Sequence, residues 1–251
     1  MSDVILQVDR LSKRFSGRAV VDRVSFDVAR GELRSVIGPN GAGKTTLFNL
    51  VSGGVRSDDG RVAFKGRDVT NLSPNRACRL GIGRTFQINS AFDGTTVRDN
   101  IRLAVIARRR RNWNMAWPSK TLFCEEVEDI AEAVELQAQL DRSIQELPYG
   151  DKRRLELALA LAGEPDLLLL DEPTCGVPVV ERGALIELIQ RTMRARSMTA
   201  LLIEHDMDIV FAVSSRIAVM HRGEIIADGA PDAISRDARV QEVYLGAPAG
   251  A

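Results

Sequence analysis

The sequence predicts an α/β fold in which a helical block interrupts a core of strands and helices. In both the N-terminal and the C-terminal part, short apolar runs bounded by turn residues are followed by helical segments, as in strands packed between helices. Between about residues 91 and 162, apolar residues instead recur at helical spacing, as at Phe123, Val127, Ile130 and Val134. We therefore expect a sheet with flanking helices and an inserted helical region.

The N-terminal part is expected to be mostly strand. Its β-rich or apolar runs cover residues 4–8, 25–28, 33–37 and 61–64. A Gly-rich turn at 38–43 separates the third of these runs from a helix that extends from Lys44 to about Ser52.

After the helical block, strands and helices alternate again. Expected strands at 167–170 and 199–203 enclose a helix at about 180–194. Two further strands, 216–220 and 224–227, are joined by His221-Arg222-Gly223 and predict a β-hairpin.

Composition limits the possible partners and compartment. The chain has 251 residues with 34 basic and 34 acidic side chains, so its formal net charge is zero, which argues against a general nucleic-acid binder. No apolar run reaches the roughly 18 residues of a membrane span, and the N-terminus lacks the features of a signal peptide. Three widely spaced cysteines fit a reducing compartment better than a disulfide framework or a zinc site. We therefore expect a neutral cytosolic protein.

Residues 38–45 carry the clearest chemical motif. They run Gly-Pro-Asn-Gly-Ala-Gly-Lys-Thr, which matches the phosphate-binding pattern GxxxxGK[ST] between an expected strand and an expected helix. Backbone N–H groups of such a loop and the following helix N-terminus attract phosphate, Lys44 reaches the β- and γ-phosphates, and the Thr45 hydroxyl binds Mg²⁺. The alternative, an ordinary Gly-rich turn, is disfavoured by this context. The expected ATP-binding residues are Gly38, Pro39, Asn40, Gly41, Ala42, Gly43, Lys44, Thr45 and Thr46.

A second motif is acidic. Residues 167–173 run Leu-Leu-Leu-Leu-Asp-Glu-Pro, an apolar strand that ends in two carboxylates. Asp171 is then the carboxylate associated with Mg²⁺, and Glu172 is the general base that polarises the attacking water. Many core strands end in acidic residues, so this motif gains its meaning from the phosphate loop upstream.

With these motifs, the chain resembles the nucleotide-binding subunits of ABC transporters from Leu11 to Gly246. Thr85-Phe86-Gln87 stands at that family's Q-loop position, and Leu147-Pro148-Tyr149-Gly150-Asp151 stands at its signature position. Glu204-His205-Asp206 occupies the place of the switch histidine, and Phe15 that of the aromatic residue that stacks on adenine. The resemblance implies a P-loop NTPase core with a mixed sheet, an antiparallel β subdomain and an inserted α-helical subdomain.

The implied organisation is one nucleotide-binding domain. The core with its β subdomain covers about 1–90 and 163–230, the helical subdomain about 91–162, and a C-terminal helical tail about 231–251.

The resemblance also implies roles for single residues. Gln87 would sense the γ-phosphate site and join the Mg²⁺ ligands, and His205 would hold the γ-phosphate or align Glu172 with the water. Tyr149 and Gly150 would present the start of the signature helix to an ATP bound by a second subunit. Considered alone, His205 would more often be a structural histidine, and Phe15 a core residue.

Two departures from the family pattern lie on surfaces offered to that second subunit. Pro148 replaces the usual signature serine, and Pro178 replaces the usual aspartate of the D-loop. Our hypothesis is that this chain contributes more weakly to the opposite ATP site.

Within the family, the chain is similar to the importers of branched-chain amino acids. The similarity rests on four features: Arg84-Thr85-Phe86-Gln87, the basic run Arg108–Arg111, the signature Tyr-Gly-Asp-Lys-Arg-Arg-Leu-Glu, and Val-Tyr-Leu-Gly at 243–246. We expect the basic run to lie on a solvated face, with a membrane-proximal role as the alternative.

The resemblance implies an ATPase subunit of an importer for branched-chain or other hydrophobic amino acids. Its implied partners are membrane-spanning permease subunits, a second nucleotide-binding subunit in a homo- or heterodimer, and indirectly a periplasmic solute-binding protein, with no nucleic acid. It would lie on the cytoplasmic face of the inner membrane. Alternatives are amide or urea import, lipopolysaccharide export, a non-transport ABC ATPase, or a regulatory module that has lost hydrolysis.

Overall fold

A six-stranded sheet forms the centre of the computed structural model, which describes residues 3–85, 94–109 and 122–245. The strand order is β10-β9-β3-β8-β7-β6, and the pairs from β9 to β6 are parallel, whereas β10 is antiparallel to β9. The strands are β3 (Leu33–Ile37), β6 (Ile82–Arg84), β7 (Leu167–Asp171), β8 (Thr199–Ile203), β9 (Arg216–His221) and β10 (Glu224–Gly229). Because the parallel strands run in one direction, their carboxyl ends meet at one edge of the sheet.

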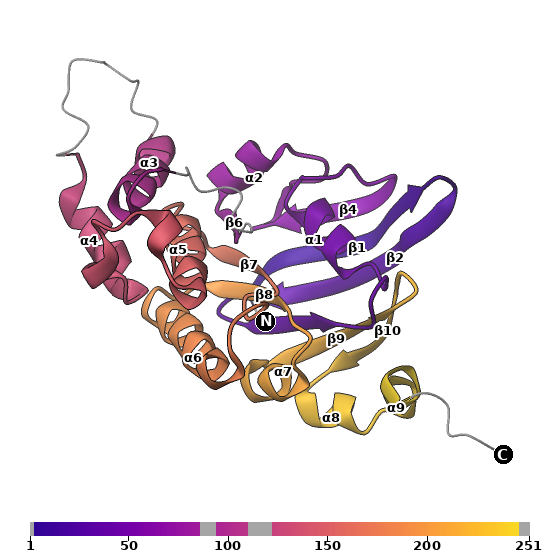
Figure 1. The fold of residues 1–251 in the computed structure, drawn as a ribbon. Helices are drawn as coiled ribbons and strands as arrows, with labels where there is room; N and C mark the ends of the chain where they lie inside the picture. Colours follow the sequence, from indigo (N-terminus) through magenta and orange to yellow (C-terminus); the bar gives the residue numbers. More distant parts are fainter. Residues whose placement is uncertain (1–2, 86–93, 110–121, 246–251) are drawn as a thin grey trace.

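A second sheet of four strands, ordered β2-β1-β4-β5, is antiparallel. Its strands are β1 (Val4–Phe15), β2 (Arg18–Ala29), β4 (Asp59–Phe64) and β5 (Arg67–Asp68). β2 alternates buried and exposed residues towards its end, as expected for a strand with one face on the core and the other in water. This sheet is seen beside α1 and the central sheet in Figure 1.

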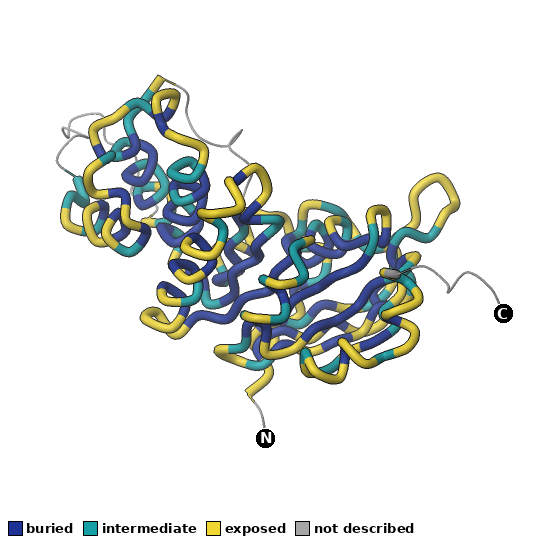
Figure 2. Tube along the Cα trace, turned by 60° about the horizontal axis from the view of Figure 1, so that its bottom comes forward, coloured by how far each residue is buried: buried dark blue, intermediate teal, exposed yellow. Residues whose placement is uncertain are grey.

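The central strands are buried on both faces, which explains their continuous apolar sequences. Successive residues of β7 and β8 point to opposite faces of the sheet and therefore pack into two different hydrophobic cores. Leu167, Leu169, Leu201 and Ile203 pack with α1 and the antiparallel sheet. Leu168, Leu170, Ala200 and Leu202 pack with the helices on the other face. Figure 2 shows the buried strands in dark blue inside exposed loops.

The helices divide into three groups. The block before β7 holds α3 (Val97–Arg109), α4 (Cys124–Ala133), the short helices at Gln137–Gln139 and Ile144–Glu146, and α5 (Tyr149–Leu161). Those along the core are α1 (Lys44–Val51), α2 (Pro74–Leu80), α6 (Val179–Ala195) and α7 (Met207–Val213), and the C-terminal ones are α8 (Pro231–Ser235) and α9 (Ala238–Leu245). In Figure 1, α3, α4 and α5 lie on the opposite side of the molecule from β1 and β2. None of the helices in the described part of the chain is both long enough and apolar enough to cross a membrane.

The expected strands and helices are present in the described part of the chain. The structure also forms elements that the sequence patterns did not indicate, among them β5, β6, α2 and α7. The predicted stripe in α4 is confirmed at Val127 and Ile130, both buried.

Within the basic run, Arg109 is exposed as expected, but Arg108 differs from its expectation. The side chain of Arg108 is only 16% exposed and forms ion pairs with Glu126 and Glu164, while Arg109 also pairs with Glu126. These contacts join α3 to α4 and to the turn after α5, so Arg108 does not lie on a solvated face. Arg110 and Arg111 lie outside the described residues.

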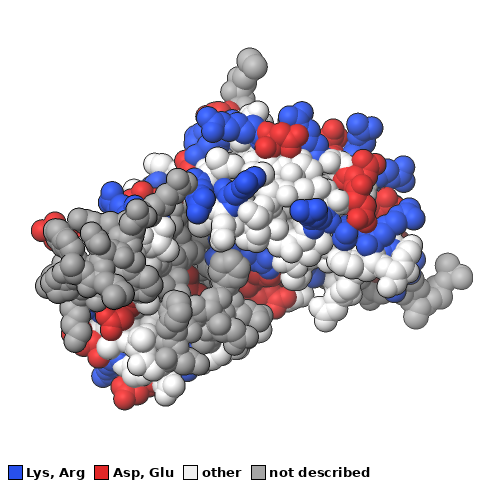
Figure 3. All heavy atoms as spheres, turned by 90° about the horizontal axis from the view of Figure 1, so that it is seen from above, with Lys and Arg blue, Asp and Glu red and all other residues white. Residues whose placement is uncertain are grey.

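Charged side chains of both signs are interspersed on the face of the molecule shown in Figure 3. Lys13 with Asp58 and Arg61 with Asp68 are among the surface ion pairs. Opposite charges therefore lie close to one another at these positions.

Candidate functional site

The phosphate loop connects β3 to α1, as predicted. Gly38 has a φ of 152°, and a Cβ there would lie 2.1 Å from the carbonyl oxygen of Met220. Gly43 has a φ of 103°, and its Cβ would lie 2.3 Å from the carbonyl oxygen of Val20. Both positions therefore require glycine on two counts, backbone conformation and close approach of a neighbouring chain.

Lys44 lies folded over this loop. Its side chain is buried, and Nζ donates to the carbonyl oxygens of Gly38 at 2.7 Å and Pro39 at 3.1 Å. Burial lowers the pKa of the Lys44 ammonium from its ordinary value, while the charges of Glu172 and Asp171 oppose this shift. The ammonium is thus held at the loop by weak carbonyl acceptors, which a phosphate oxygen could replace.

Asp171 and Glu172 lie where β7 ends, as predicted. Asp171 is bound by Arg84 of the neighbouring strand β6, whose Nη2 donates to Asp171 Oδ2 at 2.8 Å. Nη1 of Arg84 also donates to Asn49 Oδ1 on α1 at 2.5 Å. From the sequence, Arg84 was named only as part of a motif shared with the importers of branched-chain amino acids. It was given no structural role, because the strand that carries this residue was not predicted.

Glu172 and His205 meet across adjacent strand ends. His205 Nε2 lies 2.7 Å from Glu172 Oε1, and both side chains are partly exposed. Glu172 has a φ of 50°, and its backbone N–H donates to Ile203 of β8 at 2.9 Å. The structure therefore brings together two residues that lie 33 positions apart in the sequence.

Glu204 lies on the buried side of the pair formed by Glu172 and His205. No role was proposed for it from the sequence. It is buried, and its carboxylate accepts from the backbone N–H groups of Thr174 and His205, each at 2.9 Å. The Thr174 hydroxyl also donates to it. The position of Glu204 directly before the candidate histidine could have indicated this role from the sequence.

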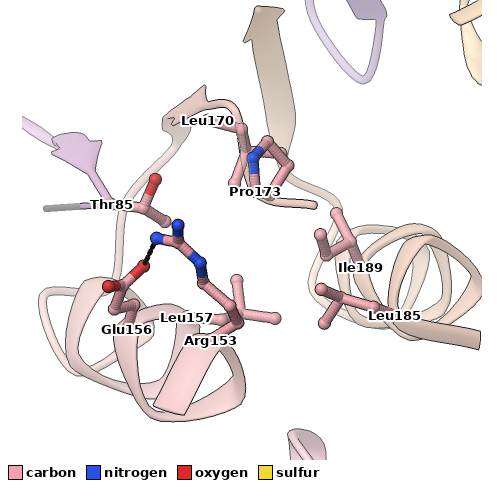
Figure 4. Close-up of a pocket in the computed structure, with 8 residues that line it drawn as sticks. All are labelled: Thr85, Arg153, Glu156, Leu157, Leu170, Pro173, Leu185 and Ile189. Atoms are coloured by element: carbon pink, nitrogen blue, oxygen red, sulfur yellow. Dashed lines mark hydrogen bonds and ion pairs between the residues drawn. The ribbon is translucent and has the colours of Figure 1, made fainter. Parts of the chain in front are cut away.

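Tyr149 and Gly150 begin α5, as predicted, but they contact another part of the chain. A Cβ on Gly176 would lie 2.6 Å from the Tyr149 ring, so this end of α5 packs on the turn after β7. Arg153, one turn further on, lines a small cavity beside the end of β7 (Figure 4). The start of α5 is therefore joined to the acidic turn of its own chain.

Of the remaining predicted residues, Ala42 is buried within the loop and the others that the structure describes lie nearer the surface of the site. Asn40, Gly41 and Thr45 are exposed, and Pro39 and Thr46 are half-buried. Phe15 at the end of β1 is 46% exposed, with Lys13 Nζ 5.4 Å from its ring centroid. Gln87 lies outside the described residues.

The loop and its surroundings fit a nucleotide. The N-cap of α1 is Gly43, which has no side chain that could cap the first turn, and this turn has no acidic residue. Its N–H groups therefore remain for an anion. No heavy atom lies within 4 Å of the place where a Cβ on Gly41 would stand, so phosphate can approach the backbone there.

The oxygen donors nearby fit Mg²⁺. A threonine hydroxyl and a carboxylate, from Thr45 and Asp171, are the hard ligands that this ion prefers. Within the described ranges, no group of three or more His, Cys, Asp or Glu side chains could hold a metal by itself.

The order of the parallel strands brings the residues of the site to one edge of the sheet. β3, β8, β7 and β6 are neighbours, so the phosphate loop, His205, Glu172 and Thr85 follow one another along the carboxyl edge of the sheet. A phosphate loop, two carboxylates and a histidine at one edge define an ATPase of the P-loop class.

Comparison with known proteins gives the family. The profile of the ABC transporter family matches residues 21–175, and one described as branched-chain amino acid ATP-binding cassette transporter matches residues 224–250. The chain belongs to the ABC transporter family and is an ATP-binding, ATP-hydrolysing subunit of it, which works with membrane permease subunits.

Individual relatives are similar over nearly their whole length. A probable branched-chain amino acid transport ATP-binding protein of Archaeoglobus fulgidus is 38% identical over 97% of this chain and 96% of its own. The high-affinity branched-chain amino acid transport ATP-binding protein of Salmonella typhimurium is 36% identical over 98% of this chain and 99% of its own.

Solved structures agree on the fold. The crystal structure of a nucleotide-free ATP-binding cassette from an ABC transporter is 30% identical, with a TM-score of 0.84 over 97% of this chain and 100% of that chain. An ADP conformation of an ATP-binding cassette of an ABC transporter has the same TM-score at 31% identity, over 97% of this chain and 99% of that chain. The predicted P-loop NTPase core with an antiparallel sheet is thus confirmed.

Proposed function

We propose that the chain supplies the energy for import of branched-chain or other hydrophobic amino acids. The observation that carries this proposal is the likeness to proteins named for branched-chain amino acid transport, which covers 97–98% of the chain at 36–38% identity. The match of residues 224–250 to the profile with the same description supports it independently of the catalytic motifs.

In this proposal, the loop at residues 38–45 binds the phosphates of ATP. N–H groups at the start of α1 bind phosphate oxygens, and Lys44 exchanges its carbonyl acceptors for the β- and γ-phosphates. Thr45, Asp171 and Gln87 would hold Mg²⁺, which would supply positive charge to neutralise the charge that develops on the phosphates. Phe15, whose ring is accessible, stacks on adenine.

Glu172 and His205 act on the attacking water. The carboxylate of Glu172 accepts a proton from the water as general base, and His205 holds this carboxylate in place. Their contact at 2.7 Å supports this assignment, because it fixes Glu172 Oε1 at the strand ends beside the phosphate loop.

A second nucleotide-binding subunit completes the site in our proposal. Tyr149 and Gly150 offer backbone N–H groups at the start of α5 to the ATP of that subunit. Pro148 and Pro178 are the N-caps of α5 and α6, and because a proline side chain carries no hydrogen-bonding group, neither offers a side-chain donor to the partner. The assembly lies on the cytoplasmic face of the inner membrane and receives solute from a periplasmic binding protein.

Transport can be tested in reconstituted vesicles. The full chain, its permease subunits and the solute-binding protein should take up leucine, isoleucine or valine when ATP and Mg²⁺ are supplied on the cytoplasmic side. Competition with urea, short amides and a charged amino acid gives the specificity. Uptake of urea or amides in preference to apolar amino acids would refute the proposed solute class, while leaving the ATPase assignment intact.

The base assignment predicts the effect of Glu172→Gln. Loss of a general base reduces catalysis by about 10²- to 10⁴-fold, so ATP turnover should fall at least about 100-fold while ATP still binds and holds two subunits together. Glu125→Gln on the exposed surface of α4 is the matched control and should keep full turnover. Phosphate release, nucleotide binding and the oligomeric state decide the result. ATPase activity close to that of the control would show that another group is the base.

A further inference from the structure

Arg153 is a buried cation whose direction is fixed within its own helix. It is only 7% exposed, and it lies one turn after the start of α5. Its Nη1 donates to Glu156 Oε2 and its Nη2 to the Tyr149 hydroxyl, both at 2.8 Å. Burial lowers the pKa of Arg153, but the hydrogen bond and the charge of Glu156 outweigh this and raise it above its ordinary value.

The same guanidinium reaches out of the helix to a main-chain carbonyl. Nε and Nη2 donate to the oxygen of Cys175 at 3.2 Å and 2.9 Å. Figure 4 shows the side chain extending from α5 beside a small cavity towards Thr85, near Leu170 of β7 and Pro173, which follows that strand. A planar fork with two donors fixes direction as well as distance. Arg153 therefore ties α5 to the turn that follows β7.

This turn begins with Glu172. The N–H of Cys175 donates to the carbonyl oxygen of Glu172 at 3.0 Å, and that of Val177 donates to Thr174 at 3.0 Å. Glu172 has a φ of 50°, a conformation that an L residue keeps only when its surroundings hold it. A shift of the Cys175 carbonyl is thus passed to the backbone of Glu172 through one hydrogen-bonded turn.

We propose that Arg153 is a positioning residue, which sets the place of Glu172 by linking the start of α5 to the turn at 172–177. The inference rests on the proposed function, in which Glu172 activates water and α5 meets a nucleotide of the second subunit. When α5 shifts as it contacts that nucleotide, the shift is transmitted to the backbone of Glu172 through the carbonyl group of Cys175. Because a misplacement of about 1 Å can cost about 100-fold in rate, the link controls turnover rather than nucleotide affinity.

The kinetic test compares three variants of the full chain. Arg153→Gln removes the cation and the fork, and Arg153→Lys keeps the charge with a single donor group. Arg154→Gln is the matched control, because the next residue on the same helix contacts Glu135 instead of the turn. We expect kcat to fall about 10- to 100-fold in Arg153→Gln with KM for ATP within about twofold, partial recovery in Arg153→Lys, and changes within about twofold in Arg154→Gln.

A second measurement does not depend on hydrolysis. Hydrogen exchange in the nucleotide-free chain should become faster at the amides of Cys175 and Val177 in Arg153→Gln, while β8 and the control variant stay unchanged. Exchange or kcat like that of Arg154→Gln would overturn the proposal, as would a rise in KM that accounts for the whole loss. If the wild-type chain hydrolysed no ATP, the proposed function would fail, and the exchange rates would still show whether Arg153 holds the turn.

Discussion

The ion pair between Arg84 and Asp171 shows how single residues prepare the site. The side chains are 14% and 18% exposed, so Asp171 has lost most of its water and depends on a cation. In this structure Arg84 supplies that cation. Binding of a metal by the carboxylate would replace the arginine, which remains held by Asn49 of α1 and by Ser52, the residue that follows α1.

This arrangement predicts a stability effect that depends on Mg²⁺. Arg84→Gln leaves the Asp171 carboxylate without its cation and should lower the free energy of unfolding by about 1–3 kcal/mol in the absence of ligands. With Mg²⁺ and ADP present, the difference from wild type should become smaller, because the metal takes over the charge. Urea unfolding with and without Mg²⁺-ADP measures both values.

Arg98→Gln is the control for that experiment. Arg98 pairs with Asp141, whose side chain is 81% exposed, so this loss should cost less than about 1 kcal/mol and should not depend on Mg²⁺-ADP. A deficit of Arg84→Gln that stays constant when Mg²⁺-ADP is added would contradict the exchange of arginine for metal.

Two glycines of the phosphate loop predict unequal effects of the same substitution. At Gly38 an added methyl group would strike the Met220 carbonyl, whereas at Gly41, with a φ of 78°, it meets open space. Gly41→Ala should therefore cost about 1 kcal/mol, from backbone conformation alone. Gly38→Ala should cost about 3 kcal/mol or more. Urea unfolding of the ligand-free chain compares them, and equal losses would show that the loop relaxes around the methyl group.

At the scale of elements, the sequence predicted those whose own pattern is strong. β3, β7 and β8 are apolar runs buried on both faces, and their limits agree with the expected ones to within one residue. The phosphate loop followed from its motif, because glycine, lysine and threonine at that spacing have few structural alternatives.

The elements that were missed owe their structure to contacts made by the rest of the fold. β6 has three residues and pairs only with β7 among the described strands, so no local periodicity could reveal it. α7 is also short, although its N-cap Asp206 accepts from Ile209 N and could have indicated a helix start. Strand order is non-local as well, since β8 lies between β3 and β7, and it places His205 beside Glu172. Arg153 and Glu204 acquire their meaning only in this arrangement.

At the scale of the whole molecule, the C-terminal helix returns to the phosphate loop near the other end of the chain. α9 carries Tyr244, which is 38% exposed and interacts with the backbone of Gly38. Burial raises the pKa of Tyr244 to about 12, against a smaller opposing effect of the Gly38 hydrogen bond. Since Gly38 begins the phosphate loop, the packing of α9 and the shape of the nucleotide site are physically joined.

This contact predicts how the chain responds to alkaline pH. A tyrosine with a raised pKa in the folded state stabilises the fold relative to the unfolded chain below pH 10, and that contribution is lost as the pH rises towards 12. The chain has two tyrosines, so Tyr244→Phe isolates the signal. At pH 11 the folded wild type and Tyr244→Phe should show nearly the same phenolate absorbance, whereas in urea they should differ by one ionised tyrosine. A full tyrosine difference in the folded proteins at pH 11 would mean that α9 leaves Tyr244 open to solvent and is not held against the phosphate loop.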